Sequence, residues 1–130
     1  MAMRPQGITA NGSTMLQRFE QLEVWKKSHS LVLAVYRLTA SFPPEEKFGL
    51  ISQMRRSAVS IPANIAEGFK RVSLKDKSHF YNISQGSLEE LRYYFILSHD
   101  LGYHDDFDLF HTQSDQIAKM LHALVKSIRP

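Results

Sequence analysis

Apolar residues recur at alternating steps of three and four along most of this chain, which is the spacing of one buried stripe on an α-helix. The first stripe consists of six positions at this spacing: Val24, Ser28, Leu31, Val35, Leu38 and Phe42. It predicts a helix over residues 22–41, which Pro43 and Pro44 stop because proline cannot continue a regular helix. No long segment shows the alternation of period two that is typical of a strand.

Three further helices follow from the same spacing. The second is predicted to begin near Glu45 and to end near Gly68, with Ile51, Met54, Ala58, Ile61 and Ile65 turned inward. Ser73 and Asp76 form a helix-start signal and Gly102 a left-handed terminator, so a long third helix is expected between them. Its apolar residues include Phe80, Ile83, Leu91, Tyr94 and Leu101. The fourth stripe is the clearest: Phe107, Phe110, Ser114, Ile117, Leu121, Leu124 and Ile128.

Pro62 interrupts the second predicted helix. It has no backbone N–H to donate and its ring crowds the carbonyl of Ala58, so the helix is expected to kink or restart there. The polar side chains of Ser57, Ser60 and Asn64 can bond to the disturbed backbone. Repair of a kink is therefore one interpretation of these residues, and a ligand notch at the kink is the other.

Four amphipathic helices joined by short connections must run antiparallel to their neighbours. The predicted fold class is therefore all-α, an antiparallel up-down-up-down four-helix bundle formed by residues 19–130. Residues 1–18 contain no apolar run and are predicted to be a flexible N-terminal extension.

Two features of the third helix point to a further contact surface. Gly86 costs about 1 kcal/mol in a helix interior relative to alanine, so a close neighbour such as another backbone or Trp25 is expected against it. Residues 93–97 are apolar on all sides of the helix, which is more than one buried stripe requires. We therefore predict self-association. The candidate interface residues are Trp25, Tyr36, Tyr81, Tyr93, Phe95 and Ile96.

Composition limits the classes of function. The chain has 130 residues, is 43% hydrophobic and contains no cysteine. The missing cysteines exclude disulfides, thiolate catalysis and cysteine-based zinc sites, and favour a reducing, cytoplasmic compartment. No apolar run is long enough to cross a membrane, so no membrane partner is expected.

Charge is unevenly distributed along the chain. Residues 53–77 hold six basic side chains against two acidic ones, whereas residues 89–108 hold six acidic side chains against one basic one. The basic cluster is the candidate nucleic-acid interface, because phosphate attraction needs clustered cations. It consists of Arg55, Arg56, Lys70, Arg71, Lys75 and Lys77. Ordinary solvated helix faces and head-to-tail association between the two segments are the alternatives.

Catalytic and metal chemistry find little support in the residues. His111 and Asp115 have helical i,i+4 spacing, but no second pair completes a metal site. Glu89 and Glu90 are adjacent, so they point about 100° apart on a helix and cannot share a proton. No glycine-rich phosphate loop follows a predicted strand. We expect no enzyme activity, no cofactor and no metal.

Several motifs occur in order along the chain. Their residues are Phe19, Leu22, Val24, Trp25, Phe42, Pro43, Gly49, Leu50, Gln53, Arg55, Arg56, Ser60, Ile61, Asn64, Ile65, Ala66, Glu67, Gly68, Phe80, Ile83, Gly86, Ser87 and Glu90. The most specific stretch runs from Arg55 and Arg56 to Asn64, Glu67 and Gly68. With these residues the chain resembles the four-helix bundle proteins encoded by intervening sequences of bacterial large-subunit ribosomal RNA genes.

The resemblance implies a ring-like homopentamer of uncharacterised cellular role. A related branch comprises accessory proteins of diversity-generating retroelements, which bind a reverse transcriptase and nucleic acid through a basic surface. The function predicted is therefore a non-enzymatic homo-oligomeric scaffold or interaction protein. The alternative is an RNA- or DNA-binding module that uses the basic cluster, with a nucleic-acid enzyme as a possible partner.

Overall fold

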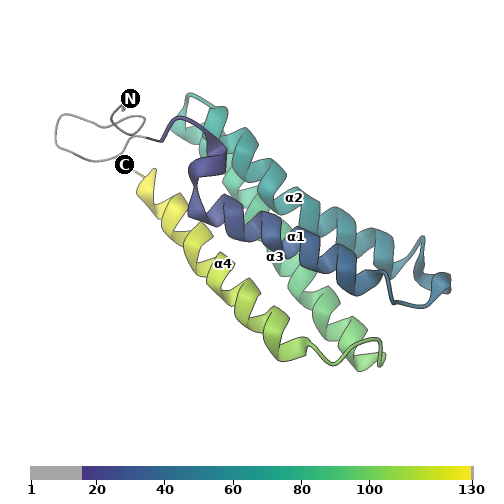
Figure 1. Ribbon diagram of the computed structural model, residues 1–130. Helices are drawn as coiled ribbons and strands as arrows, with labels where there is room; N and C mark the ends of the chain where they lie inside the picture. The colour runs from purple at the N-terminus through teal and green to yellow at the C-terminus, as the bar shows by residue number, and fades with distance from the viewer. Residues whose placement is uncertain (1–15, 130) are drawn as a thin grey trace, which may run out of the picture.

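The computed structural model describes residues 16–129, and Figure 1 shows its helices. The elements in chain order are η1 (Phe19–Gln21), α1 (Glu23–Thr39), η2 (Pro44–Glu46), α2 (Leu50–Lys70), α3 (Leu74–Asp100) and α4 (Phe107–Ser127). Most of the predicted extension, residues 1–15, lies outside the described residues. Gln17 and Arg18, also assigned to it, donate their backbone N–H groups to Oε1 of Gln21 at 2.9 and 3.0 Å. These two residues are therefore held to η1.

The four helices form the predicted bundle, with α2 and α3 packed most extensively (Figure 1). Side-chain bonds between α2 and α3 show their relative direction. Ile61 is paired with Ser84, Ser60 with Ser87, and Arg56 with Glu90. The residue numbers of the α2 partners decrease while those of the α3 partners increase, so the two helices are antiparallel.

The core confirms three of the four predicted stripes. On α1 and its C-terminal extension, Val24, Ser28, Leu31, Val35 and Phe42 are buried. On α2 the buried positions include Met54, Ala58, Ile61 and Ile65, and on α4 they include Phe110, Ser114, Ile117 and Leu121. A period of three and four therefore located these helices and their inner faces from apolar side chains alone.

The α3 stripe differs from the prediction. Leu91 is buried, but Ile83 and Leu101 are exposed. The buried stripe instead consists of Tyr81, Ser84, Ser87, Leu88, Leu91, Phe95 and Ser98. Three of its members are serines, so a pattern based on apolar residues placed the inner face incorrectly. Burial is tolerated because the hydroxyls are bonded: Ser84 Oγ donates to the Ile61 carbonyl at 2.8 Å and Ser98 Oγ to the Tyr94 carbonyl at 2.7 Å.

The start of α2 was also predicted too early. Residues 44–46 form the short η2 turn, Gly49 has a non-helical backbone, and α2 begins at Leu50. Oε1 of Glu46 accepts a hydrogen bond from the Leu50 N–H at 3.1 Å. The acidic side chain therefore caps the helix from outside it, satisfying a donor that has no partner within the first turn.

Helix α2 continues through Pro62, so the expectation of a restart is wrong. The polar side chains around the proline bond to helix carbonyls. Ser57 Oγ donates to the Met54 carbonyl at 3.1 Å and Asn64 Nδ2 to the Ser60 carbonyl at 2.8 Å. These bonds fit the predicted role of these residues in supporting the backbone.

The ends of α3 match the sequence signals. Ser73 Oγ accepts from the Asp76 N–H at 3.1 Å, and Gly102 has the left-handed φ of 81°. Within the subunit the expected close neighbour of Gly86 is absent from the described residues, because a Cβ atom there would meet nothing within 4 Å. Gly86 lies on the solvent face of α3, and neither Trp25 nor another backbone approaches it.

Candidate functional site

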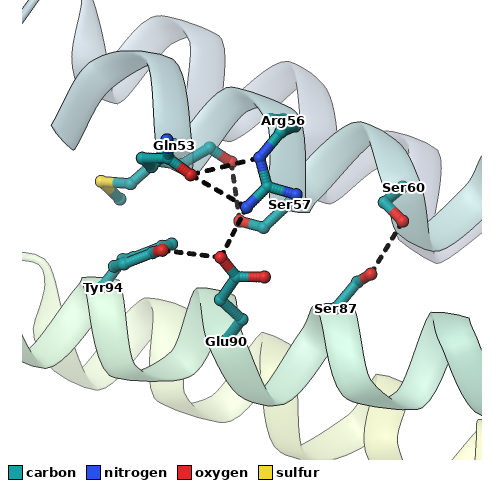
Figure 2. A network of polar contacts seen from close by, with 8 residues as sticks. Gln53, Arg56, Ser57, Ser60, Ser87, Glu90 and Tyr94 are labelled. Carbon is teal, nitrogen blue, oxygen red and sulfur yellow. Dashed lines mark hydrogen bonds and ion pairs between the residues drawn. The ribbon is translucent and has the colours of Figure 1, made fainter. Parts of the chain in front are cut away.

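Two of the motif residues, Arg56 and Gly68, contact α3 across the α2–α3 seam, whereas Arg55 contacts α1. One terminal nitrogen of Arg56 forms an ion pair with Oε2 of Glu90 at 2.6 Å and also bonds to Oε1 of Gln53 at 2.9 Å. Tyr94 donates its hydroxyl to the same Glu90 oxygen at 2.6 Å, and this bond raises the pKa of Tyr94 above its ordinary value. Figure 2 shows the network bridging the two helices. We call these four residues, Gln53, Arg56, Glu90 and Tyr94, the polar clasp, because they link α2 to α3. Both charged groups in it already have partners within the subunit.

A second polar contact lies one turn along the seam. Ser87 Oγ donates to Ser60 Oγ at 2.7 Å (Figure 2), and Asn64 Nδ2 lies 3.0 Å from the same Ser60 oxygen. Asn64, a motif residue, is therefore part of the helix contact and does not face an open site. Glu67 and Arg71 form an ion pair along α2.

Gly68 permits the closest approach of the two helices. A Cβ atom at this position would lie 2.6 Å from Cε1 of Tyr81, which real Cβ atoms do not tolerate. The motif glycine is thus required by packing: its missing side chain leaves room for a buried aromatic ring from α3.

The six basic residues form two groups instead of one cluster. Arg55 lies fifteen residues and Arg56 fourteen residues before Lys70 on α2, which corresponds to about 21–22 Å along a helix axis. Lys70, Arg71, Lys75 and Lys77 surround the α2–α3 turn.

Most of these cations also have partners inside the subunit. Arg55 lies over the Tyr36 ring at 4.5 Å, and its Nε donates to Oγ1 of Thr39 at 2.9 Å. Lys77 Nζ donates to the carbonyls of Gly68 at 3.2 Å and Phe69 at 2.8 Å, and burial lowers its pKa. Within residues 16–129, only Lys70 and Lys75 of the six carry exposed side chains without such a contact.

A groove lies on the α1–α2 side of the bundle. Its volume is about 530 Å³, and three of its lining residues are cations while none is acidic. The lining residues are Tyr36, Lys47, Phe48, Ile51, Ser52, Arg55, Arg56 and Val59. The Phe48 side chain is 87% exposed, although it is among the largest apolar groups in the chain.

Sequence reasoning missed Phe48. The available signal was an aromatic residue in a charged connection, between Lys47 and Gly49, where no helix stripe could bury it. Phe48 shares this groove with the exposed side chains of Tyr36 and Val59, and exposed apolar side chains that lie together mark an interaction surface.

The predicted interface residues divide into two sets. Tyr36, Tyr93 and Ile96 are exposed, with Tyr93 at 56%. Tyr81 and Phe95 are each 2% exposed, so their assignment to an interface is wrong: they are core residues of α3. The error follows from the predicted inner face of α3, which did not include Tyr81 or Phe95. On that prediction both residues are exposed and available for an interface.

Trp25 is half-buried within its own subunit. It packs edge-on against Phe19 and stacks on His29, with ring centroids 5.2 Å apart in each case.

In the part of the chain that is described, no three His, Asp or Glu side chains gather to hold a metal ion. None of the described helices combines the length and apolar character needed to cross a membrane.

Comparisons with known proteins agree with this geometry. No curated protein sequence matches the chain. A crystal structure from Bacteroides thetaiotaomicron VPI-5482, of a protein of unknown function from the S23 ribosomal protein family, has a TM-score of 0.71 and 25% identity. The match covers 79% of this chain and 98% of that one. The model of the 23S rRNA-intervening sequence protein family matches residues 20–123. The chain belongs to the 23S rRNA-intervening sequence protein family.

Proposed function

We propose that this protein is a non-enzymatic building block of a homo-oligomer that serves as a scaffold or interaction platform. The observation that carries the proposal is the exposure of Phe48 in a groove that also exposes the apolar side chains of Tyr36 and Val59. Burying a phenylalanine side chain is worth roughly 1.5–3 kcal/mol, which a monomer leaves unused. The resemblance noted in the sequence implies that the oligomer is a ring of five.

Exposed apolar residues on other faces support the same proposal. Tyr93 and Ile96 lie on the solvent side of α3, and Leu109 lies on α4. Apolar surface on both the α1–α2 and the α3–α4 sides is what a ring requires, because each subunit must contact two neighbours through different faces.

The non-enzymatic part of the proposal rests on the chemistry of the motif residues. Arg56, Glu90 and Tyr94 bond to one another, and Asn64 bonds within its own helix. Residues engaged in this way hold two helices together. A catalytic site would instead direct such groups at a cavity.

The direct test is the mass of the purified protein in solution, measured by native mass spectrometry and by light scattering over a range of concentrations. We expect an assembly of five subunits at micromolar concentration. A protein that stays monomeric across this range contradicts the proposal.

A second candidate is RNA or DNA binding at the α2–α3 turn. It is favoured by Lys70 and Lys75, whose charges are exposed and have no acidic partner in the described part of the chain. Lys70→Ala with Lys75→Ala should then weaken RNA binding at low salt and reduce its salt dependence. Arg55→Ala is the matched control, because Arg55 is bonded to Thr39 and lies at the other end of α2. Absence of RNA binding by the wild-type protein rejects this candidate.

A further inference from the structure

Phe48 is an exposed aromatic side chain in the η2–α2 connection. The Lys47 ammonium group lies 5.5 Å from its ring centroid. The cations Arg55 and Arg56 lie in the same groove. The surface here therefore presents an exposed phenyl ring surrounded by the basic side chains of Lys47, Arg55 and Arg56.

A pocket of about 140 Å³ lies between α3 and α4. It is lined by Arg92, Phe95, Ile96, Phe107, His111 and Ser114. A cavity of about 150 Å³ with apolar walls is large enough to hold a benzene ring. The pocket is thus of the right size for one phenyl group, which would lie against Phe95, Ile96 and Phe107, with Arg92, His111 and Ser114 completing the walls.

The ring and the pocket lie at the same end of the bundle but on different sides. The connections α1–α2 and α3–α4 meet at that end (Figure 1), where the Tyr103 hydroxyl donates to Oε2 of Glu46 at 2.9 Å. Phe48 belongs to the α1–α2 side and the pocket to the α3–α4 side. A rotation about one axis can therefore bring the ring of one copy to the pocket of the next, and such a contact between two different surfaces forms a ring where the rotation closes.

Charge favours the same pairing. The groove around Phe48 contains Lys47, Arg55 and Arg56 and no acid. Beside the pocket, the start of α4 carries the exposed carboxylates of Asp105, Asp106 and Asp108. Arg92 in the pocket wall is already 3.4 Å from Oε2 of Glu89, and its guanidinium plane can lie against an aromatic ring.

We propose that the Phe48 ring of one subunit inserts into the α3–α4 pocket of a neighbouring copy, with the basic groove facing the acidic start of α4. The contact rests on the proposed homo-oligomer and specifies its interface. It is heterologous, because the two partners contribute different surfaces.

The first experiment compares Phe48→Ala with Val72→Ala. Val72 is 96% exposed in the α2–α3 turn at the opposite end of the bundle, so it is a matched loss of exposed apolar surface. Phe48→Ala should weaken each contact by roughly 10- to 100-fold and shift the mass toward the monomer. Val72→Ala should assemble like the wild type. Both variants should keep the wild-type helical signal, because neither side chain is buried.

The second experiment uses the absence of native cysteine. Phe48→Cys and Ile96→Cys subunits, each with a different tag, are co-expressed and oxidised. A disulfide between the two kinds of subunit is expected, since Ile96 lines the pocket. The controls are each variant alone and Val72→Cys with Ile96→Cys.

The outcomes separate the contact from the assembly. A wild-type monomer overturns the proposed oligomer and the contact together. A wild-type oligomer that persists in Phe48→Ala, or that gives no cross-link between positions 48 and 96, overturns the contact alone. Equal cross-linking by Phe48→Cys without its partner indicates a symmetric interface and also overturns it.

Discussion

Gly68 on α2 lies directly against the ring of Tyr81 on α3. A Cβ atom at Gly68 would be 2.6 Å from Cε1 and 2.8 Å from Cδ1 of Tyr81, and 3.2 Å from Cβ of Phe80. The tyrosine ring is buried, which raises the pKa of its hydroxyl, and it cannot move outward without opening the core. The glycine and the aromatic ring therefore determine together how closely α2 and α3 approach.

Gly68→Ala should destabilise the bundle. The added methyl group overlaps a ring that has no free space, and overpacking of this kind costs roughly 1–3 kcal/mol. The measurement is the free energy of unfolding from urea denaturation. Gly86→Ala is the matched control on α3, because its Cβ would meet nothing within 4 Å. It should stabilise the protein by about 0.5–1 kcal/mol, the ordinary gain of alanine over glycine in a helix. Equal effects of the two substitutions would contradict this account.

Ser114→Ala should leave stability unchanged or raise it by up to about 1 kcal/mol. The Ser114 hydroxyl is fully buried on α4 and has no hydrogen-bond partner within the described structure. Removing an unsatisfied polar atom removes its desolvation cost. Ser84→Ala is the comparison, since Ser84 Oγ donates to the Ile61 carbonyl at 2.8 Å. That variant should lose roughly 1 kcal/mol, and thermal unfolding of both proteins measures the difference. A larger loss for Ser114→Ala would show that its hydroxyl is bonded after all.

Protonation of His104 should lower the free energy of unfolding as the pH falls below about 6.5. Burial lowers the pKa of this side chain from its ordinary value of 6.5, so the unfolded chain binds a proton at a pH where the folded one does not. Its Nδ1 accepts from the Asp106 N–H at 3.1 Å, and its Nε2 lies 3.0 Å from Ser98 Oγ. Protonation of Nδ1 would break the Asp106 bond.

The sign follows from the direction of the shift. The stabilisation by neutral His104 is present above the unfolded pKa and is lost as the pH falls toward the lower folded pKa. Urea unfolding between about pH 7.5 and pH 5 measures this loss. His104→Gln carries no titrating group, so its stability should change less over the same range. If the stability of His104→Gln changes with pH as steeply as that of the wild type, the loss of stability comes from other titrating groups. His99 and Asp105 lie near enough to act on His104.

Glu90→Ala should lower the free energy of unfolding by about 1 kcal/mol. The carboxylate holds both Arg56 and Tyr94, but the ion pair is partly exposed, and exposed pairs contribute little. A second readout is sharper: the pKa of Tyr94 should fall toward its ordinary value once the bond from Glu90 is gone. Ultraviolet titration of the tyrosines detects this. Glu89→Ala is the control, and an unchanged Tyr94 titration in Glu90→Ala would refute the clasp.

The α3 helix shows best how far sequence pattern reaches. Its existence and its ends followed from Ser73, Asp76 and Gly102, whose capping roles are local. Its inner face did not follow, because Ser84, Ser87 and Ser98 occupy core positions that a search for apolar residues passes over. Their burial depends on acceptors supplied by other parts of the fold, such as the Ile61 carbonyl on α2.

The candidate site shows the same division. The motif residues could be picked out from the order Arg55, Arg56, Asn64, Glu67 and Gly68, and the exposed residues Tyr36, Tyr93 and Ile96 from excess apolar surface. Their roles could not. That Arg56 is held by Glu90 and Gly68 by Tyr81 depends on which positions of α2 and α3 lie opposite each other.

The chain alone determined four helices, the antiparallel course of α2 and α3, and three of the four inner faces, because helix period, caps and short connections act between residues near in sequence. Only the tertiary structure decided which cations are already bonded, that Tyr81 and Phe95 belong to the core, and that Phe48 is left exposed by its own subunit. The reason is physical: burial and pairing are set by residues far apart in the chain, and a helical period carries no information about which of them will meet.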